Sequence, residues 1–343
     1  MMNPQLGRLG SVSPSLLNGG SAKPTFRGDL VDFFTFKGKG NMDLDRNIII
    51  GLLDNKLTAY NFGWSLMSGY GGYNENYNNF RQLSGTTGVF TNTDHSIHIS
   101  NVNAVNIPVT EVPYKAGEIS PEYQIKVTGL LEGQYCDIGY FYNYAGNIKP
   151  SVQKNLIHIL KDGIYTIPSF TFPSDIKSGT GTRIVFNFAG DTDITIEQIP
   201  LYEGAIVTDG VDDYLKLDKV GYKVRTIIIK FKPINIKPNV VNAIVNIHTD
   251  EVALQYDTSG VINSNFTTYK NYEEYGVGIF NVDKNAIIPL TLGCKLSNSG
   301  RPMEYSNVAI YSVAIYQNVL TAEEIQKEIS EAFPKYEQLI LNR

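Results

Sequence analysis

The sequence predicts an all-β protein built from two tandem β-sandwiches, and three observations support this fold class. Tyrosine, phenylalanine and glycine are abundant, with 22, 16 and 31 copies respectively, and they favour strands and turns over helices. Short runs of alternating apolar residues recur along the chain between clusters of turn residues. Because 42% of the residues are hydrophobic and 18% are charged, the chain can bury ordinary hydrophobic cores.

The first part of the chain, residues 1–40, is predicted to be an extended anchoring arm. Gly, Ser, Pro, Asn and Leu dominate its first 28 residues, and no acidic residue occurs before Asp29. Such a segment cannot bury enough apolar surface to fold alone, so we expect a partner subunit to hold it. The tripeptide Arg27-Gly28-Asp29 matches a cell-adhesion motif, but three residues recur by chance too readily to indicate that function.

Strand-like runs fill the next segment, residues 41–201, which we assign to the first sandwich. They lie at residues 47–54, 95–102, 123–130, 135–144, 163–172, 182–190 and 193–202. Turn residues separate them, for example the Gly- and Asn-rich stretch 68–79. Seven or more short strands at this spacing indicate a β-sandwich rather than a parallel sheet.

A second run of strands fills residues 202–343, the second predicted sandwich. These strands lie at residues 214–220, 225–233, 242–248, 251–257, 275–282, 287–296 and 307–316. Residues 319–333 then form the clearest predicted helix, with Thr321 as its N-cap and Glu324 completing a capping box. Apolar residues at helical spacing predict that one face docks on the sandwich, and Pro334 is expected to end the helix.

Two stretches of the second sandwich carry a family resemblance. Residues 204–217 read GAIVTDGVDDYLKL, and residues 307–329 read NVAIYSVAIYQNVLTAEEIQKEI. Together, in this order and at this separation, they resemble the laminin-G-like branch of the concanavalin-A-like lectins and glucanases. The resemblance implies a jelly-roll sandwich with a short C-terminal helix. The first sandwich resembles carbohydrate-binding-module jelly rolls, and the whole layout is similar to virion proteins of crAss-like tailed phages that infect gut Bacteroidetes.

Catalysis is not expected, although the resembled group contains glucanases. Retaining glucanases of this fold resemble one another in a Glu-x-Asp-x-Glu strand, whose alternation places the nucleophile and the acid about 5 Å apart on one face. This sequence contains no Glu-x-Asp, and the nearest run, Asp193 to Glu197, lacks the middle acid. We therefore predict no catalytic residues.

Neither a metal nor a cofactor is predicted. His95 and His98 are three residues apart on a strand and face opposite sides, so they cannot bind one ion together. Residues 43–54 imitate an EF-hand loop, but Ile48 stands where the turn requires glycine. Asp209, Asp212 and Asp213 form an acidic turn, whose predicted function is structural, with carboxylates accepting hydrogen bonds from turn amides. An ion there is the less favoured alternative.

The best candidate binding residues are four aromatic side chains in the segment 64–80. Trp64, Tyr70, Tyr73 and Tyr77 lie among glycines and asparagines, and flat rings beside amides suit the recognition of sugars. The same composition suits a protein interface, where Tyr, Gly and Asn give adaptable contacts. The third interpretation places Trp64 in the core with the tyrosines covering its rim.

Several classes of partner are disfavoured by composition. The net charge of −5 argues against nucleic acid, because a phosphate backbone requires clustered positive charge. No window approaches 18 consecutive apolar residues, and the first 20 residues lack the apolar run of a secretory signal, so we expect no membrane partner. Cys136 and Cys294 are expected to be buried free thiols.

These observations and the resemblance together favour a non-enzymatic phage virion protein of structural or adhesive function, such as a head fibre or tail-associated appendage. Its expected partners are other virion proteins of the capsid or tail, contacted through the arm, and further copies of itself, with a trimer favoured. A host surface glycan is a further candidate partner. We expect the protein in the virion, after synthesis in the host cytoplasm. The alternatives are a polysaccharide depolymerase or glycosidase and a bacterial surface glycan-binding protein.

Overall fold

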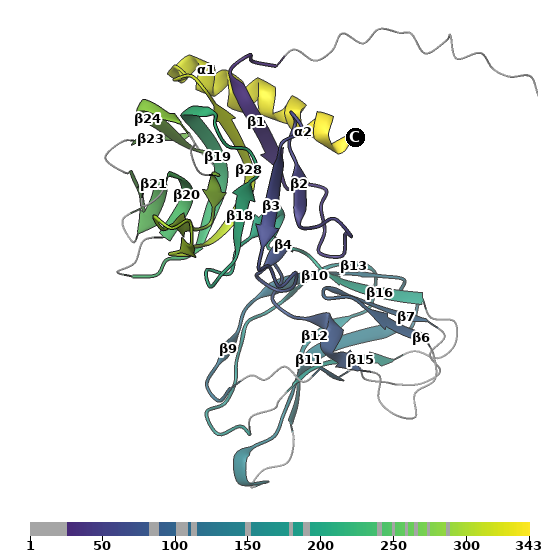
Figure 1. Ribbon diagram of the computed structural model, residues 1–343. Coiled ribbons are helices and arrows are strands. Elements are labelled where there is room, and N and C mark those ends of the chain that lie inside the picture. The colour runs from purple at the N-terminus through teal and green to yellow at the C-terminus, as the bar shows by residue number, and fades with distance from the viewer. Residues whose placement is uncertain are drawn as a thin grey trace, which may run out of the picture.

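The computed structural model shows an all-β protein of two β-sandwiches and one C-terminal helical segment (Figure 1). It describes residues 26–81, 89–100, 109–110, 115–147, 152–177, 181–187, 193–238, 242–248, 251–257, 260–263, 267–272, 275–285 and 289–343. The predicted fold class, two sandwiches with a short C-terminal helix, is confirmed. Most of the predicted arm, residues 1–25, lies outside the described residues.

The smaller sandwich contains two five-stranded antiparallel sheets. One sheet has the order β13 (Gly163–Ile167), β10 (Tyr123–Thr128), β16 (Asp193–Gln198), β7 (Ser96–Ser100) and β6 (Val89–Asn92). The other has the order β12 (Val152–Ile159), β11 (Tyr135–Tyr142), β15 (Gly181–Asn187), β8 (Val109–Thr110) and β5 (Phe80–Arg81). A two-stranded ribbon of β9 (Ile119–Ser120) and β14 (Phe170–Thr171) accompanies them, with 3-10 turns at Tyr77–Asn79 and Ala145–Asn147. Alternate isoleucines and valines of these strands meet in one core.

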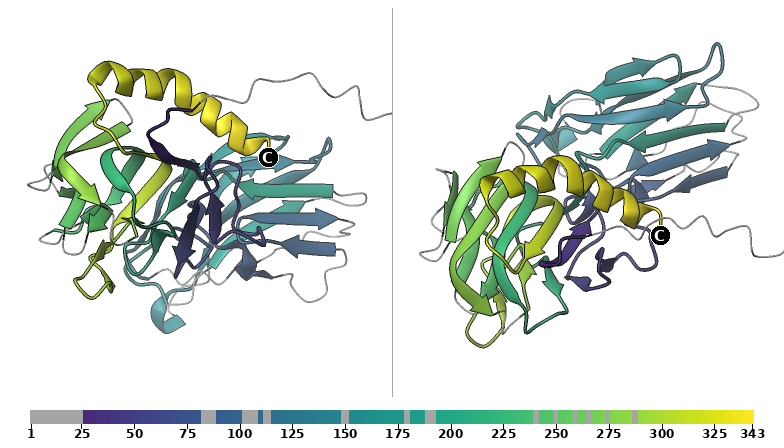
Figure 2. Two further views of the ribbon diagram at one scale, coloured as in Figure 1. Left: turned by 45° about the horizontal axis from the view of Figure 1, so that its top comes forward. Right: turned by 90° about the horizontal axis from the view of Figure 1, so that it is seen from above.

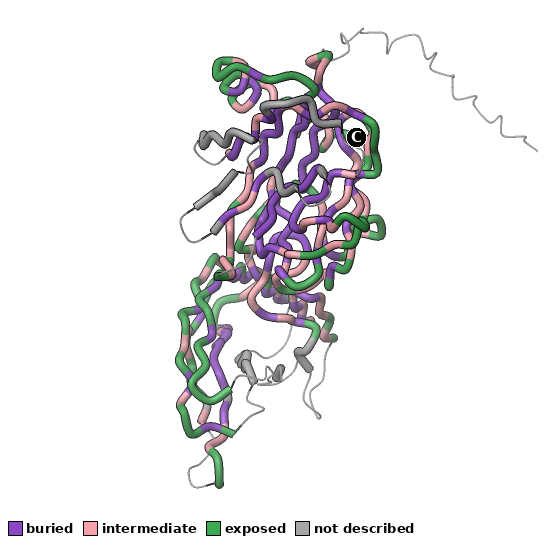
Figure 3. Tube along the Cα trace, turned by 60° about the vertical axis from the view of Figure 1, so that its left-hand side comes forward, coloured by how far each residue is buried: buried purple, intermediate pink, exposed green. Residues whose placement is uncertain are grey.

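The larger sandwich contains two seven-stranded antiparallel sheets. The first, sheet A, has the order β23 (Thr267–Tyr272), β24 (Tyr275–Asn285), β19 (Lys223–Asn235), β28 (Asn307–Tyr316), β17 (Tyr202–Val207) and β4 (Gly69–Gly71), with β1 (Leu30–Thr35) also paired to β28. The second, sheet B, has the order β2 (Ile48–Ile50), β3 (Lys56–Tyr60), β18 (Tyr214–Leu217), β25 (Thr291–Leu292), β20 (Asn242–His248), β21 (Glu251–Asp257) and β22 (Gly260–Asn263). A ribbon of β26 (Lys295–Leu296) and β27 (Pro302–Met303) follows β25. In Figure 3 the buried positions concentrate in these strands.

The predicted boundary between arm and first sandwich is wrong, because residues 30–71 belong to the larger sandwich. Strand β1 pairs with β28, β3 pairs with β18, and β4 pairs with β17. The smaller sandwich is therefore inserted between two parts of the larger one rather than placed before it. Sequence order alone does not show this, since strands distant in the chain can complete the same sheet.

The two sandwiches are joined by buried amide side chains. The side chain of Asn41 accepts a hydrogen bond from the Tyr70 amide at 2.7 Å and donates one to the Asp94 carboxylate at 3.1 Å. The side chain of Gln198 likewise donates to the carbonyl of Glu75 and accepts from its amide. These bonds satisfy buried polar groups at the chain crossings between the sandwiches.

Strand β28 is the centre of sheet A and contains a β-bulge. Its residues 312–316 pair with β1 on one side, and residues 309–310 pair with β17 on the same side. On the other side, Lys230 of β19 pairs with Ser312 and Phe231 pairs with Ile310, so Tyr311 is an extra residue in β28. The bulge changes which positions of β28 face the core. Even-numbered residues, Val308 and Ile310, point into the core before it, and odd-numbered residues, Val313 and Ile315, do so after it.

The C-terminal helical segment lies along the larger sandwich (Figure 2). It consists of α1 (Ala322–Lys327), a π-helical turn (Glu328–Ala332) and α2 (Phe333–Leu341). The predicted capping box of Thr321 and Glu324 is present. The prediction that Pro334 ends the helix is wrong: the π turn widens the helix just before the proline, whose ring would otherwise meet the carbonyl of residue 330.

The helix is held by an aromatic cluster on the outer face of sheet A. Phe33 of β1 packs on Phe333 at 4.8 Å and on Tyr336 at 5.4 Å between ring centroids. The buried carboxylate of Glu328 accepts hydrogen bonds from the hydroxyls of Tyr316 (2.9 Å) and Tyr336 (3.2 Å). Within the part of the chain that the structure describes, no helix has the length and apolar character needed to cross a bilayer.

Candidate functional site

The aromatic residues predicted as a binding site do not form one exposed surface. Tyr70 is 3% exposed and Tyr77 is fully buried. Trp64 is partly buried and stacks between Phe62 (5.2 Å) and Tyr70 (5.6 Å). The Tyr70 hydroxyl donates a hydrogen bond to a backbone carbonyl at 2.7 Å. These contacts place Trp64 and Tyr70 against the core of the larger sandwich.

The other two tyrosines of this segment lie towards the smaller sandwich. Tyr73 is partly buried and stacks on His95, with 4.8 Å between centroids and 10° between planes. Tyr77 packs into the core of the smaller sandwich, and burial raises its pKa well above the ordinary value. The segment connects the two sandwiches, and this arrangement favours the core interpretation over a ligand platform.

Carboxylates of the acidic turn, residues 209–213, accept hydrogen bonds from backbone amides of the same turn. One carboxylate oxygen of Asp209 accepts hydrogen bonds from the amides of Val211 (2.7 Å) and Asp212 (3.3 Å), and Asp213 accepts one from the amide of Asp209 (3.0 Å). Asp213 is fully buried, and this burial raises its pKa to about 6. The three carboxylates approach within 4.8 Å of one another, and those of Asp209 and Asp213 accept hydrogen bonds from amides of the turn.

His95, His98, His158 and the two cysteines do not come together in one site. His95 contacts Asp94 at 2.6 Å, His158 contacts Asp137 at 2.5 Å, and the side chain of His98 contacts that of Thr195 at 3.1 Å. Cys136 and Cys294 are buried free thiols, and burial raises the pKa of Cys294 to about 12. No two of these described contacts share a partner, so they do not build a common centre.

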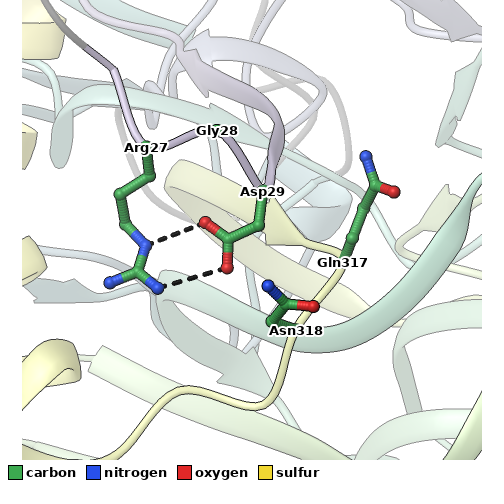
Figure 4. A pocket seen from close by; sticks show the side chains of 5 residues that line it. All are labelled: Arg27, Gly28, Asp29, Gln317 and Asn318. Carbon is green, nitrogen blue, oxygen red and sulfur yellow. Dashed lines mark hydrogen bonds and ion pairs between the residues drawn. The ribbon is translucent and has the colours of Figure 1, made fainter.

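The Arg27-Gly28-Asp29 tripeptide is engaged in internal ion pairs (Figure 4). The guanidinium of Arg27 donates to both carboxylate oxygens of Asp29, at 2.9 and 3.2 Å, and to Glu324 of α1 at 2.9 Å. The Asp29 carboxylate raises the pKa of Arg27 above its ordinary value. A cavity of about 510 Å³ beside them is lined by these residues and by Gln317 and Asn318. The tripeptide thus attaches the N-terminal segment to the helix.

A better candidate lies on the outer face of sheet A, beyond the end of the helix-covered part. A hollow of about 230 Å³ is lined by Lys230, Phe231, Lys232 and Tyr311. We call these four residues the tyrosine–lysine groove. They come from β19 and from the bulge of β28, so the irregularity of sheet A and the hollow coincide. Bulges commonly re-aim a side chain at a functional surface.

The lysines of the groove are positioned by aromatic rings. The ammonium of Lys230 lies 5.4 Å from the ring centroid of Tyr311 and 5.6 Å from that of Tyr275. The ammonium of Lys232 lies 5.5 Å from the ring centroid of Tyr202. Each contact is a cation–π interaction worth about 1 kcal/mol at partly exposed sites. Beneath the tyrosines, Ala205, Val207 and Ala309 are buried, and Tyr202 and Tyr311 pack against them.

The sequence contains a signal for this groove that strand prediction did not use. Residues 228–233 read IIKFKP, so Lys230 and Lys232 lie on one face of a strand whose preceding outward position, Ile228, is apolar. A switch from apolar to basic along one strand face indicates where a covering element stops. The bulge at Tyr311, by contrast, is visible only once strand pairing is known.

Comparisons with known proteins leave the family open. No protein-family model matches the sequence, and no curated protein matches it either. One solved structure with similarity is the N-terminal tandem CBM22 domain of Paenibacillus barcinonensis Xyn10C, at 10% identity and a TM-score of 0.25, over 74% of this chain and 99% of that one. Another is infectious bursal disease virus, Gx strain, at 10% identity and a TM-score of 0.18, over 88% of this chain and 53% of that one.

Proposed function

We propose that the protein is a non-catalytic glycan-binding protein whose ligand lies in the tyrosine–lysine groove. The observation that carries the proposal is the hollow at the β28 bulge, which Tyr311 lines together with two lysines whose ammonium groups lie over aromatic rings. Sugar sites combine apolar faces with a few fixed polar groups. The aromatic rings restrict the lysines before the ligand arrives, which lowers the entropic cost of binding.

The absence of catalysis is part of this proposal. Glycoside hydrolysis requires two carboxyl groups on either side of the scissile bond, about 5 Å or 6.5–9.5 Å apart. Among the residues that the structure describes, the four that line the groove include no acid. A reducing-end assay on capsular polysaccharides addresses the depolymerase alternative. Sustained turnover that disappears when one carboxylate is replaced would overturn the non-catalytic assignment.

We further propose that the protein is a virion appendage, such as a head fibre or tail-associated subunit of a tailed phage. The resemblance of residues 202–333 to laminin-G-like modules and the arm-like composition of residues 1–25 support it. Mass spectrometry of purified phage particles should detect the chain, and size-exclusion chromatography should show an oligomer, with a trimer favoured. Detection only in the bacterial membrane fraction would instead favour the bacterial surface alternative.

The glycan proposal is tested by a binding screen with the full chain and two matched variants. Tyr311→Ala removes the groove's ring, and Tyr60→Ala removes a partly buried tyrosine of sheet B that stacks on Tyr214. We expect any glycan bound by the wild type to lose at least about tenfold in affinity with Tyr311→Ala and to keep its affinity with Tyr60→Ala. Equal loss in both variants, or no bound glycan in the screen, would contradict the proposal.

A further inference from the structure

We propose that copies of this chain exchange their N-terminal strand, so that β1 of one copy completes sheet A of the next. The partner is a second copy of this chain, and the surface is the part of β28 that pairs with residues 30–35. This inference rests on the proposed assembly of the protein into an oligomer, and it adds the contact that joins the copies. It does not depend on glycan binding.

Strand β1 is held by elements that lie elsewhere in the sequence. It pairs with β28, near the other end of the chain. On the outer face of sheet A, Phe33 packs on Phe333 and Tyr336 of the helix. The carboxylate of Asp32 accepts a hydrogen bond from the amide of Leu53 at 2.8 Å. A second copy offers the same groups, so exchange preserves every one of these contacts and changes only the connection to β1.

The exchanged strand is apolar enough to hold two copies together. All six residues of β1 are buried, and four of them are Leu, Val or Phe. Phe34 lies in the core of the larger sandwich, and Phe33 lies under the helix. Without β1, these side chains and one edge of β28 would be exposed to water. The strand must therefore insert into a sheet, and the sheet of a neighbouring copy satisfies it as well as its own.

A short link that contains two glycines joins β1 to the rest of the sandwich. Residues 37–40 read Lys-Gly-Lys-Gly, and Lys37 and Gly38 are exposed. Gly38 has a φ of +81°, which glycine adopts without a steric penalty. The far side of the link is fixed, because the ammonium of Lys39 pairs with Asp45 at 2.7 Å. The chain can therefore change direction at Lys37 and Gly38, and short hinges of this kind favour exchange.

Exchange also gives the predicted arm a partner. Arg27 pairs with Glu324 of α1 at 2.9 Å, so the transferred piece includes the residues just before β1. Residues 1–25 precede that piece, and their composition predicts that they need a partner to become ordered. An exchanged β1 would carry them onto the neighbouring copy. If each copy passes its strand to the next in one direction, the contact closes into a ring, as a trimer requires.

The experiment combines two single-cysteine variants that only exchange can join. Thr35 of β1 and Ser312 of β28 are partners in the strand register, and partners in an antiparallel pair lie close enough for a disulfide. Full-length Thr35→Cys and Ser312→Cys chains are co-expressed with different tags, oxidised and separated on a non-reducing gel. We expect a covalent product that carries both tags. Each variant expressed alone should give none, because Cys136 and Cys294 are buried.

The matched control uses β3 and β18, which exchange leaves within one copy. Thr58 and Lys216 are register partners there, so co-expressed Thr58→Cys and Lys216→Cys chains should give no product with both tags. An equal yield of two-tag product from the two mixtures would overturn the exchange. So would an oligomer in size-exclusion chromatography whose Thr35→Cys/Ser312→Cys double variant forms its disulfide within one chain only. That result leaves the oligomer standing, whereas a monomer would overturn both.

A second variant tests the same contact without cysteines. A Gly-Ser-Gly-Ser insertion between Gly38 and Lys39 lengthens the link, so β1 can return to its own sheet more easily. Size-exclusion chromatography should show a shift from oligomer towards monomer, and thermal melting checks that the variant folds. An oligomer of unchanged size and amount would contradict the exchange.

Discussion

The outer face of sheet A has a covered half and an open half, and the same two strands run through both. Under the helix, the outward residues of β19 and β28 are Ile228, Ala314 and Tyr316, all buried against the helix and β1. Beyond the β28 bulge, the outward residues become Lys230, Lys232 and Tyr311, which remain partly or fully accessible. Side-chain chemistry therefore changes at the position where the covering element stops.

This contrast shows how one strand can supply both stability and recognition. The covered half buries large apolar side chains, and such burial stabilises a fold in proportion to the area removed from water. In the open half the buried residues are smaller, Ala205, Val207 and Ala309. The side chains above them, such as Lys232 and Tyr311, stay partly or fully exposed, so they contribute less to stability. Substitutions in the covered half should therefore lower the free energy of unfolding, whereas substitutions in the open half should lower the affinity for a glycan.

The largest expected effect is a loss of stability in the covered half. Phe333 is 1% exposed and contacts Phe33 and Tyr275. Phe333→Ala should lower the free energy of unfolding by about 3–5 kcal/mol, because it removes a buried ring and leaves a cavity. Chemical denaturation measures the change. A loss below about 1 kcal/mol would mean that the helix does not depend on this contact.

The next prediction concerns the pH dependence of stability, which involves a residue outside both halves of sheet A. Burial raises the pKa of Asp213 from 3.8 to about 6, so the folded state favours its protonated form. This contribution is fully present below pH 3.8, falls as the pH rises through 6 and is absent above it; two pKa units correspond to about 3 kcal/mol. Asp213→Asn should flatten the dependence of stability on pH between 4 and 6. Asp212→Asn, at an exposed position of the same turn, is the control: it removes only a minor cause of the raised pKa of Asp213 and should leave most of that dependence in place.

A smaller loss of stability is expected when Glu328, the buried acid of the π-helical turn, is replaced. Glu328→Ala leaves the hydroxyls of Tyr316 and Tyr336 without their carboxylate acceptor. Loss of a buried partner costs about 1–3 kcal/mol, and denaturant titration should show it. Glu331→Ala, on the exposed side of the same turn, should change stability by less than about 0.5 kcal/mol. Equal effects would argue that the carboxylate of Glu328 is not the stabilising group.

The smallest stability change should occur in the open half. Tyr311→Ala removes a partly exposed ring, so we expect about 1 kcal/mol or less in unfolding free energy, alongside the loss of glycan affinity already predicted. If Tyr311→Ala destabilises the chain as much as Phe333→Ala, the bulge serves the fold rather than a ligand. The comparison between the halves would then fail.

Local patterns in the sequence predicted much of the fold. The alternating runs identified most strands, and Thr321 with Glu324 located the helix start through a capping box. What local patterns could not show is which distant strands pair. The segment LVDFFT lies within the predicted arm, residues 1–40, whereas in the fold it completes sheet A beside β28.

The candidate site was harder to predict than the fold. The tyrosines among glycines predict a binding surface, but Tyr70 and Tyr77 are buried where the chain passes between the sandwiches. The groove instead depends on a bulge at Tyr311 and on rings from β17, β24 and β28 that meet lysines of β19. These residues lie far apart in sequence, so only tertiary pairing brings them together.

The most direct test of the account is to map where a bound glycan protects the chain. Hydrogen–deuterium exchange of the full protein, saturated with the glycan that binds best in the screen, should show new protection in residues 230–234 and 309–312. Sheet B residues 56–60 and 214–217 should be unchanged. Protection confined to sheet B or to the smaller sandwich would contradict the assignment of the open half of sheet A as the binding surface.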